Sequence, residues 1–293
     1  MDKYNVTKKQ SSFLYRLIKF IHTAFIKHKI EYWITGGTLL GAIRHGGLIP
    51  WDDDGDICIM NDQLPKLRKL KKYFSRHGYV LDQFSDQDND KVKCCGRGKN
   101  NTDICDWYIG HKDQDLGCDI FVMMPDPKRS TKITYANPYW RNQSNGGKKC
   151  YFELDHLYPL IPQHFGNYFV YGPNNPIEHL NHCYGTSWNY QAQMLYNHRT
   201  GEWHAGTLRT MKSKEFHTIE PPKSTKCDKP PPVRRRTRKI KSSRAPLKRS
   251  RIRSSSIVQR KRSSIAQRKR SRSSIAQRKR SSIAQRKRSR SSR

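Results

Sequence analysis

The end of the chain lacks whole classes of side chain. Residues 233–293 contain no Asp, no Glu and no aromatic residue, although they hold 26 of the chain's 58 Lys and Arg residues. Such a segment has too few large apolar side chains to offset the entropy lost on folding. The first 232 residues keep 32 basic and 24 acidic residues and therefore carry only +8 of the formal charge of +34. We predict a mildly basic folded body followed by a disordered polycationic tail.

Long hydrophobic runs are also missing. No stretch of about 20 apolar residues occurs, so no membrane-spanning helix is predicted. Residues 13–26 are interrupted by Arg16, Lys19 and His22 and lack a cleavage site, which does not fit a signal peptide. Their apolar residues recur at steps of three and four, which predicts an amphipathic helix packed on a core, with a membrane-surface helix as the alternative. We expect an intracellular, cytoplasmic protein, with a nuclear location also open through the basic tail.

The eight cysteines form no C-x-x-C pair and no repeated spacing. Without a signal peptide, this pattern favours reduced thiols over a disulfide framework. A zinc site built from Cys94, Cys95, Cys105 and a histidine such as His111 remains an open alternative.

Periodicity and turn residues suggest one domain over residues 1–220, a Pro-rich linker over 221–232 and the tail over 233–293. Helices are expected at 10–29, 38–44, 64–77 and 176–184, and strands at 31–35, 56–60, 79–81, 92–95, 105–109 and 119–123. Residues 125–175 indicate irregular structure with short strands, and 186–220 give no clear assignment. Within the tail, a Ser-Ser-Ile-Ala/Val-Gln-Arg-Lys-Arg unit recurs without helical periodicity, which is typical of low-complexity sequence.

Four carboxylates crowd into residues 52–56. Such charges repel one another unless a cation lies among them. On an extended segment, side chains at i and i+2 share a face, so Asp54 and Asp56 point the same way, as does Asp52 if the strand begins there. Oxygen ligands on one face suit a hard divalent ion such as Mg²⁺ or Mn²⁺. A solvated Asp-rich turn is the plain alternative.

A glycine turn precedes this cluster. Gly36 and Gly37 remove side chains where the backbone must approach another group, and the helix start that follows, at Thr38, is suited to phosphate. Arg44 adds a planar donor for phosphate oxygens. Taken singly, a Gly-Gly pair is usually a turn and an arginine a surface charge; their spacing ahead of the carboxylates favours a phosphate site.

The run from residue 36 to residue 57 resembles the LicD family, which includes fukutin and fukutin-related protein. The resemblance covers roughly residues 10–190 and includes weaker blocks in the same order, at 118–121, 158–160, 171–176 and 184–188. It implies an α+β, nucleotidyltransferase-type fold with a small mixed sheet flanked by helices. One departure is Gly55, where the family usually has an apolar residue; glycine weakens a strand.

The resemblance also implies an activity: a phosphotransferase that moves phosphocholine or an alditol phosphate from a CDP-activated donor to a glycan or sugar hydroxyl. In that pattern Asp54 and Asp56 hold the metal, with Asp52 nearby, and Asp119 is a third catalytic carboxylate or only a strand-end cap. Gly36, Gly37, Thr38 and Arg44 would contact phosphate.

Two other functions stay open at this point. One hypothesis is a non-catalytic protein with an inactive, enzyme-like body, because the tail is suited to non-specific binding of a polyanion such as RNA, DNA or an acidic surface. The other hypothesis is a nucleotidyltransferase, whose body transfers a nucleotide to a small molecule or an RNA.

Overall fold

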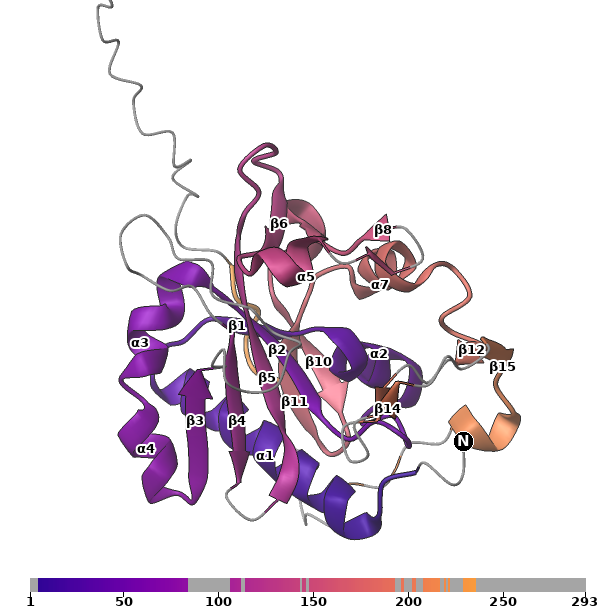
Figure 1. The fold of residues 1–293 in the computed structure, drawn as a ribbon, viewed down its shortest axis with the longest axis horizontal. Helices are drawn as coiled ribbons and strands as arrows, with labels where there is room; N and C mark the ends of the chain where they lie inside the picture. Colours follow the sequence, from indigo (N-terminus) through magenta and orange to yellow (C-terminus); the bar gives the residue numbers. More distant parts are fainter. Residues whose placement is uncertain are drawn as a thin grey trace, which may run out of the picture. The chain divides into compact units, whose positions relative to one another are not determined.

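The centre of the fold is a seven-stranded mixed sheet (Figure 1). The structure, a computed structural model, describes residues 5–83, 106–111, 114–142, 144–145, 148–192, 196–197, 202–203, 208–216, 219, 221 and 229–235. The strands of this sheet, in spatial order, are β1 (Tyr32–Ile34), β2 (Gly55–Met60), β5 (Gln114–Pro125), β4 (Trp107–His111) and β3 (Tyr79–Gln83), with β6 (Lys132–Tyr135) added to β5 and β9 (Phe152–Glu153) to β6. Only the β2–β5 pair within it is parallel.

Helices flank this sheet, as the α+β prediction required. They are α1 (Lys8–Lys27), α2 (Gly36–His45), α3 (Leu64–Arg68), α4 (Lys71–Arg76), α5 (Pro138–Asn142), α6 (Leu154–Leu157) and α7 (Pro176–Tyr184), together with the 3-10 turns η2 (Asn61–Gln63) and η3 (Ser213–Phe216). A hairpin of β10 (Ile161–Phe165) and β11 (Tyr168–Gly172) adds a second small sheet. Two-residue strands complete the described elements: β7 (Ser144–Asn145), β8 (Lys148–Lys149), β12 (Gln191–Ala192), β13 (Tyr196–Asn197), β14 (Glu202–Trp203) and β15 (Arg209–Thr210).

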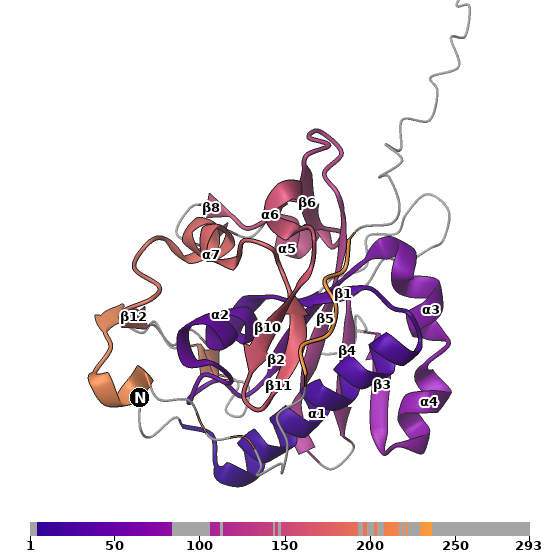
Figure 2. The same ribbon diagram turned by 180° about the vertical axis from the view of Figure 1, so that it is seen from behind.

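Helix α1 begins at a capping box, in which Thr7 and Gln10 satisfy each other's backbone N–H groups. Its apolar stripe is buried and lies across one face of the sheet (Figure 2), through the side chains of Phe13, Leu14, Leu17, Ile18, Ile21 and Phe25. The prediction that this segment packs on the core is therefore confirmed. Among the described helices, none combines the length and the apolar character needed to cross a bilayer.

Tertiary packing changes several expected elements. The single helix predicted at 64–77 is two short helices, because the chain turns at Lys69 and Leu70. The strand expected at 105–109 runs from Trp107 to His111, and the one expected at 119–123 extends over the whole of β5. The strand expected at 92–95 lies outside the described residues.

The segment that contains Pro232 and Arg234 is docked on the β10–β11 hairpin and the residue before it, Leu160. The hydroxyl of Tyr171 donates to the carbonyl oxygen of Pro232 (2.7 Å), and the backbone groups of Leu160 and Arg234 exchange two hydrogen bonds of 2.9 Å. The guanidinium of Arg234 lies 4.7 Å from the centre of the Tyr171 ring. The backbone therefore contacts the domain as far as Arg234, while residues 236–293 lie outside the described part and the disordered tail stays a prediction.

A buried carboxylate joins three strands. Strand β4 pairs with the first half of β5 and β6 with its end. Between these two pairings, the backbone N–H of Val122 donates to Asp106 (2.7 Å), and the amide of Asn137, just after β6, donates to the other oxygen of Asp106 (2.7 Å). Burial raises the pKa of Asp106 to about 6, although these hydrogen bonds oppose the rise.

This pKa predicts a pH-dependent stability. Because the folded pKa lies above that of an unfolded Asp, the contribution of Asp106 is fully present below about pH 4 and is lost as the pH rises through about 6. The free energy of unfolding should fall by up to about 3 kcal/mol over this window. Denaturant titrations should show that Asp106→Asn removes this component. The exposed Asp82→Asn, which breaks the surface pair with Lys71, should leave it in place. An unchanged pH profile in Asp106→Asn would contradict the assignment.

Candidate active site

The register of the parallel strands brings two predicted carboxylates side by side. Asp56 on β2 is the direct partner of Asp119 on β5. Both side chains are half-buried, and because side chains alternate along a strand, both point away from the face that α1 covers. Asp119 therefore lies next to the Asp-x-Asp segment, 63 positions away in the sequence from Asp56.

The start of α2 holds Asp56 in place. The backbone N–H of Thr38 donates to Oδ2 of Asp56 (3.3 Å), and the backbone N–H of Asp56 donates to the hydroxyl of Thr38 (2.7 Å). The N–H of Thr35 also donates to the carbonyl oxygen of Asp56 (3.1 Å). A carboxylate at a helix N-terminus is favoured by the unpaired N–H groups there. Thr38 therefore positions a carboxylate, and its contact with phosphate stays a prediction.

Gly36 and Gly37 allow the carboxylates to approach the backbone closely. Gly36 has φ +53°, in the left-handed region, and a Cβ there would lie 2.5 Å from Oδ2 of Asp56. A Cβ on Gly37 would overlap Oδ2 of Asp52 and would lie 3.3 Å from Oδ2 of Asp56. The two glycines thus make room for the carboxylates of Asp52 and Asp56 at one end of α2.

Asp54 belongs to the same negatively charged region. Burial raises the pKa of the Cys118 thiol well above its ordinary value, and the charges of Asp119, Asp56 and Asp54 raise it further. Cys118 also explains the unusual glycine at position 55. A Cβ on Gly55 would lie 3.2 Å from Sγ of Cys118, so the neighbouring strand already fills the space that an apolar side chain would take.

Arg44 lies on the last turn of α2 and makes several contacts within the protein. Its Nη1 donates to the carbonyl oxygens of Trp188 (2.8 Å) and Gln191 (3.0 Å), and its Nε donates to Nε2 of His45 (2.9 Å). Burial lowers the pKa of Arg44 to about 10, and the charge of Asp52 opposes that change. Arg44 therefore remains a cation within the influence of the carboxylates, and its predicted role as a phosphate donor stays untested.

A cavity of about 160 Å³ opens beside Asp56. Its walls are formed by Thr35, Gly36, Phe121, Tyr135, Trp140, Cys150, His179, Cys183 and Tyr184. Phe121 packs edge-on against both Tyr135 and Trp140, with ring centroids 5.6 Å apart in each case. Trp140 in turn hydrogen-bonds to the buried carboxylate of Asp106. The cavity is thus acidic at one end and aromatic along its side.

A disulfide in the wall of this cavity shows that the prediction of reduced thiols is wrong for two of the cysteines. Cys150 and Cys183 form a disulfide, although 33 positions separate them, whereas Cys58 and Cys118 are free and buried. The fold brings the segment before β9 against α7, which no local motif signals. Cys94, Cys95 and Cys105 lie outside the described residues, so the zinc alternative stays untested; His111 packs against Phe13 and Tyr79.

Sequence reasoning missed three features of this site. Asp106 belongs to no recognisable sequence motif. Tyr184 entered the sequence analysis only as the first residue of the block 184–188 that resembles the family. Desolvation of its hydroxyl raises the pKa of Tyr184, and the charges of Asp56, Asp52 and Asp54 add to the rise. The grouping of Cys150, His179 and Cys183 is the third. The i, i+4 spacing of His179 and Cys183 was the available signal, but it is too common to identify a site alone.

Residues 29–175, half of the chain, match the family model described as LicD/FKTN/FKRP, nucleotidyltransferase domain. An uncharacterised protein of Rickettsia prowazekii is 34% identical over 185 residues, 63% of this chain and 58% of the relative. Ribitol 5-phosphate transferase FKRP of Mus musculus is 27% identical over 151 residues, 50% of this chain and 26% of the relative. Lipopolysaccharide cholinephosphotransferase LicD of Haemophilus influenzae is 47% identical over 47 residues, 16% of this chain and 18% of the relative. The chain spans about half the length of the first relatives it matches.

The close approach at Gly36 predicts a specific cost of substitution. Gly36→Ala should be destabilised both by the left-handed backbone, about 1–2 kcal/mol, and by overlap with Asp56, a further 1–3 kcal/mol. Gly46→Ala is the matched control, because Gly46 also has a positive φ (+70°) but a Cβ there would meet no other atom within 4 Å. Denaturant unfolding should give the larger loss for Gly36→Ala; equal losses would show that the contact with Asp56 is unimportant.

Proposed function

The chain belongs to the LicD/FKTN/FKRP family, and from that membership we propose that it is a divalent-metal-dependent phosphotransferase. It would move a phospho-alcohol group from a CDP-activated donor to a hydroxyl of a sugar or glycan. The observation that carries this proposal is the pairing of Asp56 with Asp119 beside the glycine-led start of α2. Carboxylates next to a phosphate-suited helix start are the groups that a metal-assisted phosphoryl transfer requires.

The donor set fits a hard divalent ion. Asp52, Asp54 and Asp56 would hold Mg²⁺ or Mn²⁺, because carboxylate oxygens are the ligands that these ions prefer. The described aspartates do not form a tight three-ligand group by themselves. Because carboxylates repel one another, a bound cation would lower the cost of bringing them close together. When bound, the ion would neutralise charge on the pyrophosphate of the donor.

The chain's own residues divide the remaining tasks. Asp119 lies beside Asp56 and would accept the proton of the acceptor hydroxyl or complete the metal site. Gly36 and Gly37 would let the donor's phosphates approach the backbone at the start of α2. Thr38 keeps the carboxylate of Asp56 oriented, and the charge of Arg44 offsets part of the negative potential.

The cavity next to Asp56 suggests which head group the donor carries. At about 160 Å³ it is smaller than the roughly 300 Å³ at which pockets for whole drug-sized ligands begin, so it suits one part of the donor. Aromatic side chains bind quaternary ammonium groups through cation–π attraction. The walls formed by Phe121, Tyr135 and Trp140 therefore favour phosphocholine over an alditol phosphate.

Transfer of the nucleotide itself is the second candidate function. The description of the matching family model names a nucleotidyltransferase domain, which supports this alternative. The two reactions differ in their products: a phosphotransferase releases CMP, whereas a nucleotidyltransferase attaches the nucleotide to its acceptor.

Substitution of the carboxylates tests the phosphotransferase. The full-length protein with Mg²⁺ or Mn²⁺ should release CMP from a panel of CDP-linked donors, and CDP-choline should be preferred over CDP-ribitol. Asp54→Asn and Asp56→Asn should each reduce the rate of CMP release by at least about 10²-fold, because each removes a carboxylate that would hold the divalent ion, and with it the charge stabilisation that the ion supplies.

Asp62→Asn is the matched control, because Asp62 is an exposed carboxylate in the turn η2, which directly follows β2. Its CMP release should be unchanged. Turnover retained in both Asp54→Asn and Asp56→Asn, or nucleotide found on the product, would exclude the proposed reaction.

A further inference from the structure

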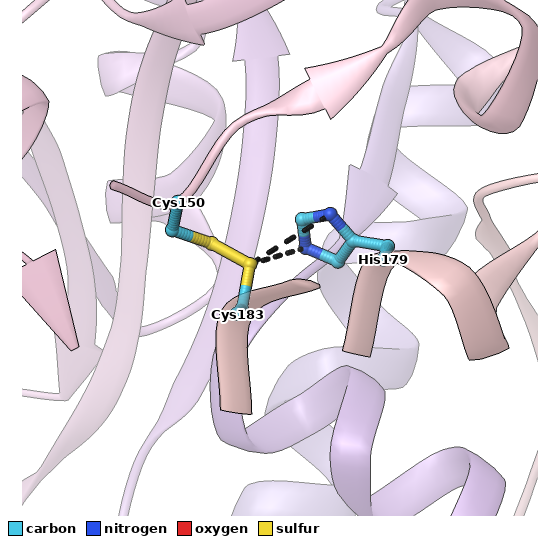
Figure 3. A group of neighbouring side chains, drawn as sticks. All are labelled: Cys150, His179 and Cys183. Atoms are coloured by element: carbon cyan, nitrogen blue, oxygen red, sulfur yellow. Dashed lines mark hydrogen bonds between the residues drawn. A yellow bond between two sulfur atoms is a disulfide. The ribbon is translucent and has the colours of Figure 1, made fainter. Parts of the chain in front are cut away.

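Three metal-ligating groups other than the aspartates meet on the wall of the cavity. Cys150, which follows β8, and His179 and Cys183 on α7 each offer one ligand atom, and these atoms all lie within 4.8 Å of one another (Figure 3). Nε2 of His179 is 3.6 Å from Sγ of Cys183. Ligand atoms of a tetrahedral zinc site lie about 3.3–3.8 Å apart, given bonds of about 2.0–2.3 Å to the metal. The histidine and one sulfur thus already have the required separation.

The histidine ring lies beside the sulfur of Cys183, with Nε2 at 3.6 Å and Nδ1 at 3.9 Å from Sγ. Its Nδ1 donates to the carbonyl oxygen of Tyr151 (3.1 Å), so Nε2, the ring nitrogen nearer to Sγ, is the one that keeps a lone pair for a metal. The ring also stacks on Phe152, with centroids 3.6 Å apart and planes 5° apart. A backbone carbonyl that accepts from the far nitrogen is the usual support of a histidine that binds a metal.

The helix that carries two of the groups is firmly held. Asn175 caps its first turn by accepting from the N–H of Glu178, and Trp188 donates to Asn181 (2.8 Å). Because His179 and Cys183 are four residues apart, they share one face of this helix. The two cysteines and the ring also line the same cavity as Asp56, so a fourth ligand position would open into it.

We propose that Cys150, His179 and Cys183 form a redox-dependent zinc site, which binds Zn²⁺ when the disulfide is reduced. A dithiol reductant would supply two electrons and two protons, giving two thiols and the oxidised reductant. Binding of Zn²⁺ then releases the two thiol protons, because thiolates are the ligands. Two thiolates and a neutral imidazole balance the charge of the ion, which suits a buried site.

The experiment compares zinc binding by the reduced and the oxidised full-length protein. After reduction, removal of the reductant and exposure to ZnCl₂, elemental analysis should find about one more zinc ion per chain than in the oxidised form. Controlled oxidation should release that zinc to a chromogenic chelator. Zinc should also protect Cys150 and Cys183 of the unmutated protein from alkylation, as read by peptide mass spectrometry.

Variants locate the ion. His179→Gln and Cys183→Ser should each reduce zinc affinity by at least about 10²-fold, because loss even of a group that supports a ligand costs 10–100-fold. His182→Gln on the same helix and Cys118→Ala are the matched controls, and both should keep the zinc affinity of the unmutated protein. Circular dichroism establishes whether each variant is folded.

Zinc binding that is equal in His179→Gln and the unmutated protein, or alkylation of Cys150 and Cys183 at the same rate with and without zinc, would overturn the proposal and leave a purely structural disulfide. None of these measurements uses turnover, so the result is independent of the phosphotransferase assignment.

Discussion

The parallel pairing of β2 with β5 is the contact on which the rest of the site depends. It sets Asp56 directly beside Asp119, and because side chains alternate along a strand, both carboxylates point away from the face that α1 covers. A shift of this register by one residue would move every side chain of β2 to the opposite face. The buried residues of β2 and β5 oppose such a shift, because one face of the strands packs on α1 and its apolar stripe.

Close packing around the carboxylates follows from this pairing. Asp56 is held by both backbone and side chain of Thr38, and this geometry exists only because Gly36 lacks a Cβ. On the other face of β2, Gly55 lacks a Cβ where Cys118 of the partner strand fills the space. Cys118 of β5 therefore fills the space beside Gly55, and the strand pairing is retained around it.

The cavity is built outward from the same strand. Phe121 follows Asp119 by two positions on the same face of β5 and packs against Tyr135 and Trp140. Trp140 is fixed by the buried carboxylate of Asp106, which also closes the gap between β4 and β6. On the opposite wall, the segment before β9 and helix α7 meet through Cys150 and Cys183. The carboxylate of Asp56, the aromatic rings and the two cysteines therefore line the same cavity.

Short stretches of sequence were enough to predict the elements whose formation and boundaries depend on neighbouring residues. The apolar period of α1, the break at Gly78 before β3 and the Pro176 and Gly185 boundaries of α7 could all be read from neighbouring residues. The family resemblance predicted Asp54, Asp56 and Asp119 as candidate site residues, but not the strand register that makes Asp56 and Asp119 neighbours. By itself, the sequence determined the class of fold, the main helices and the crowding of carboxylates at 52–56. Only the tertiary structure decided that Asp106 is buried, that Cys150 meets Cys183 and His179, and that these groups share a cavity with Asp56, because such contacts join residues far apart in the chain and depend on how the sheet and α7 pack.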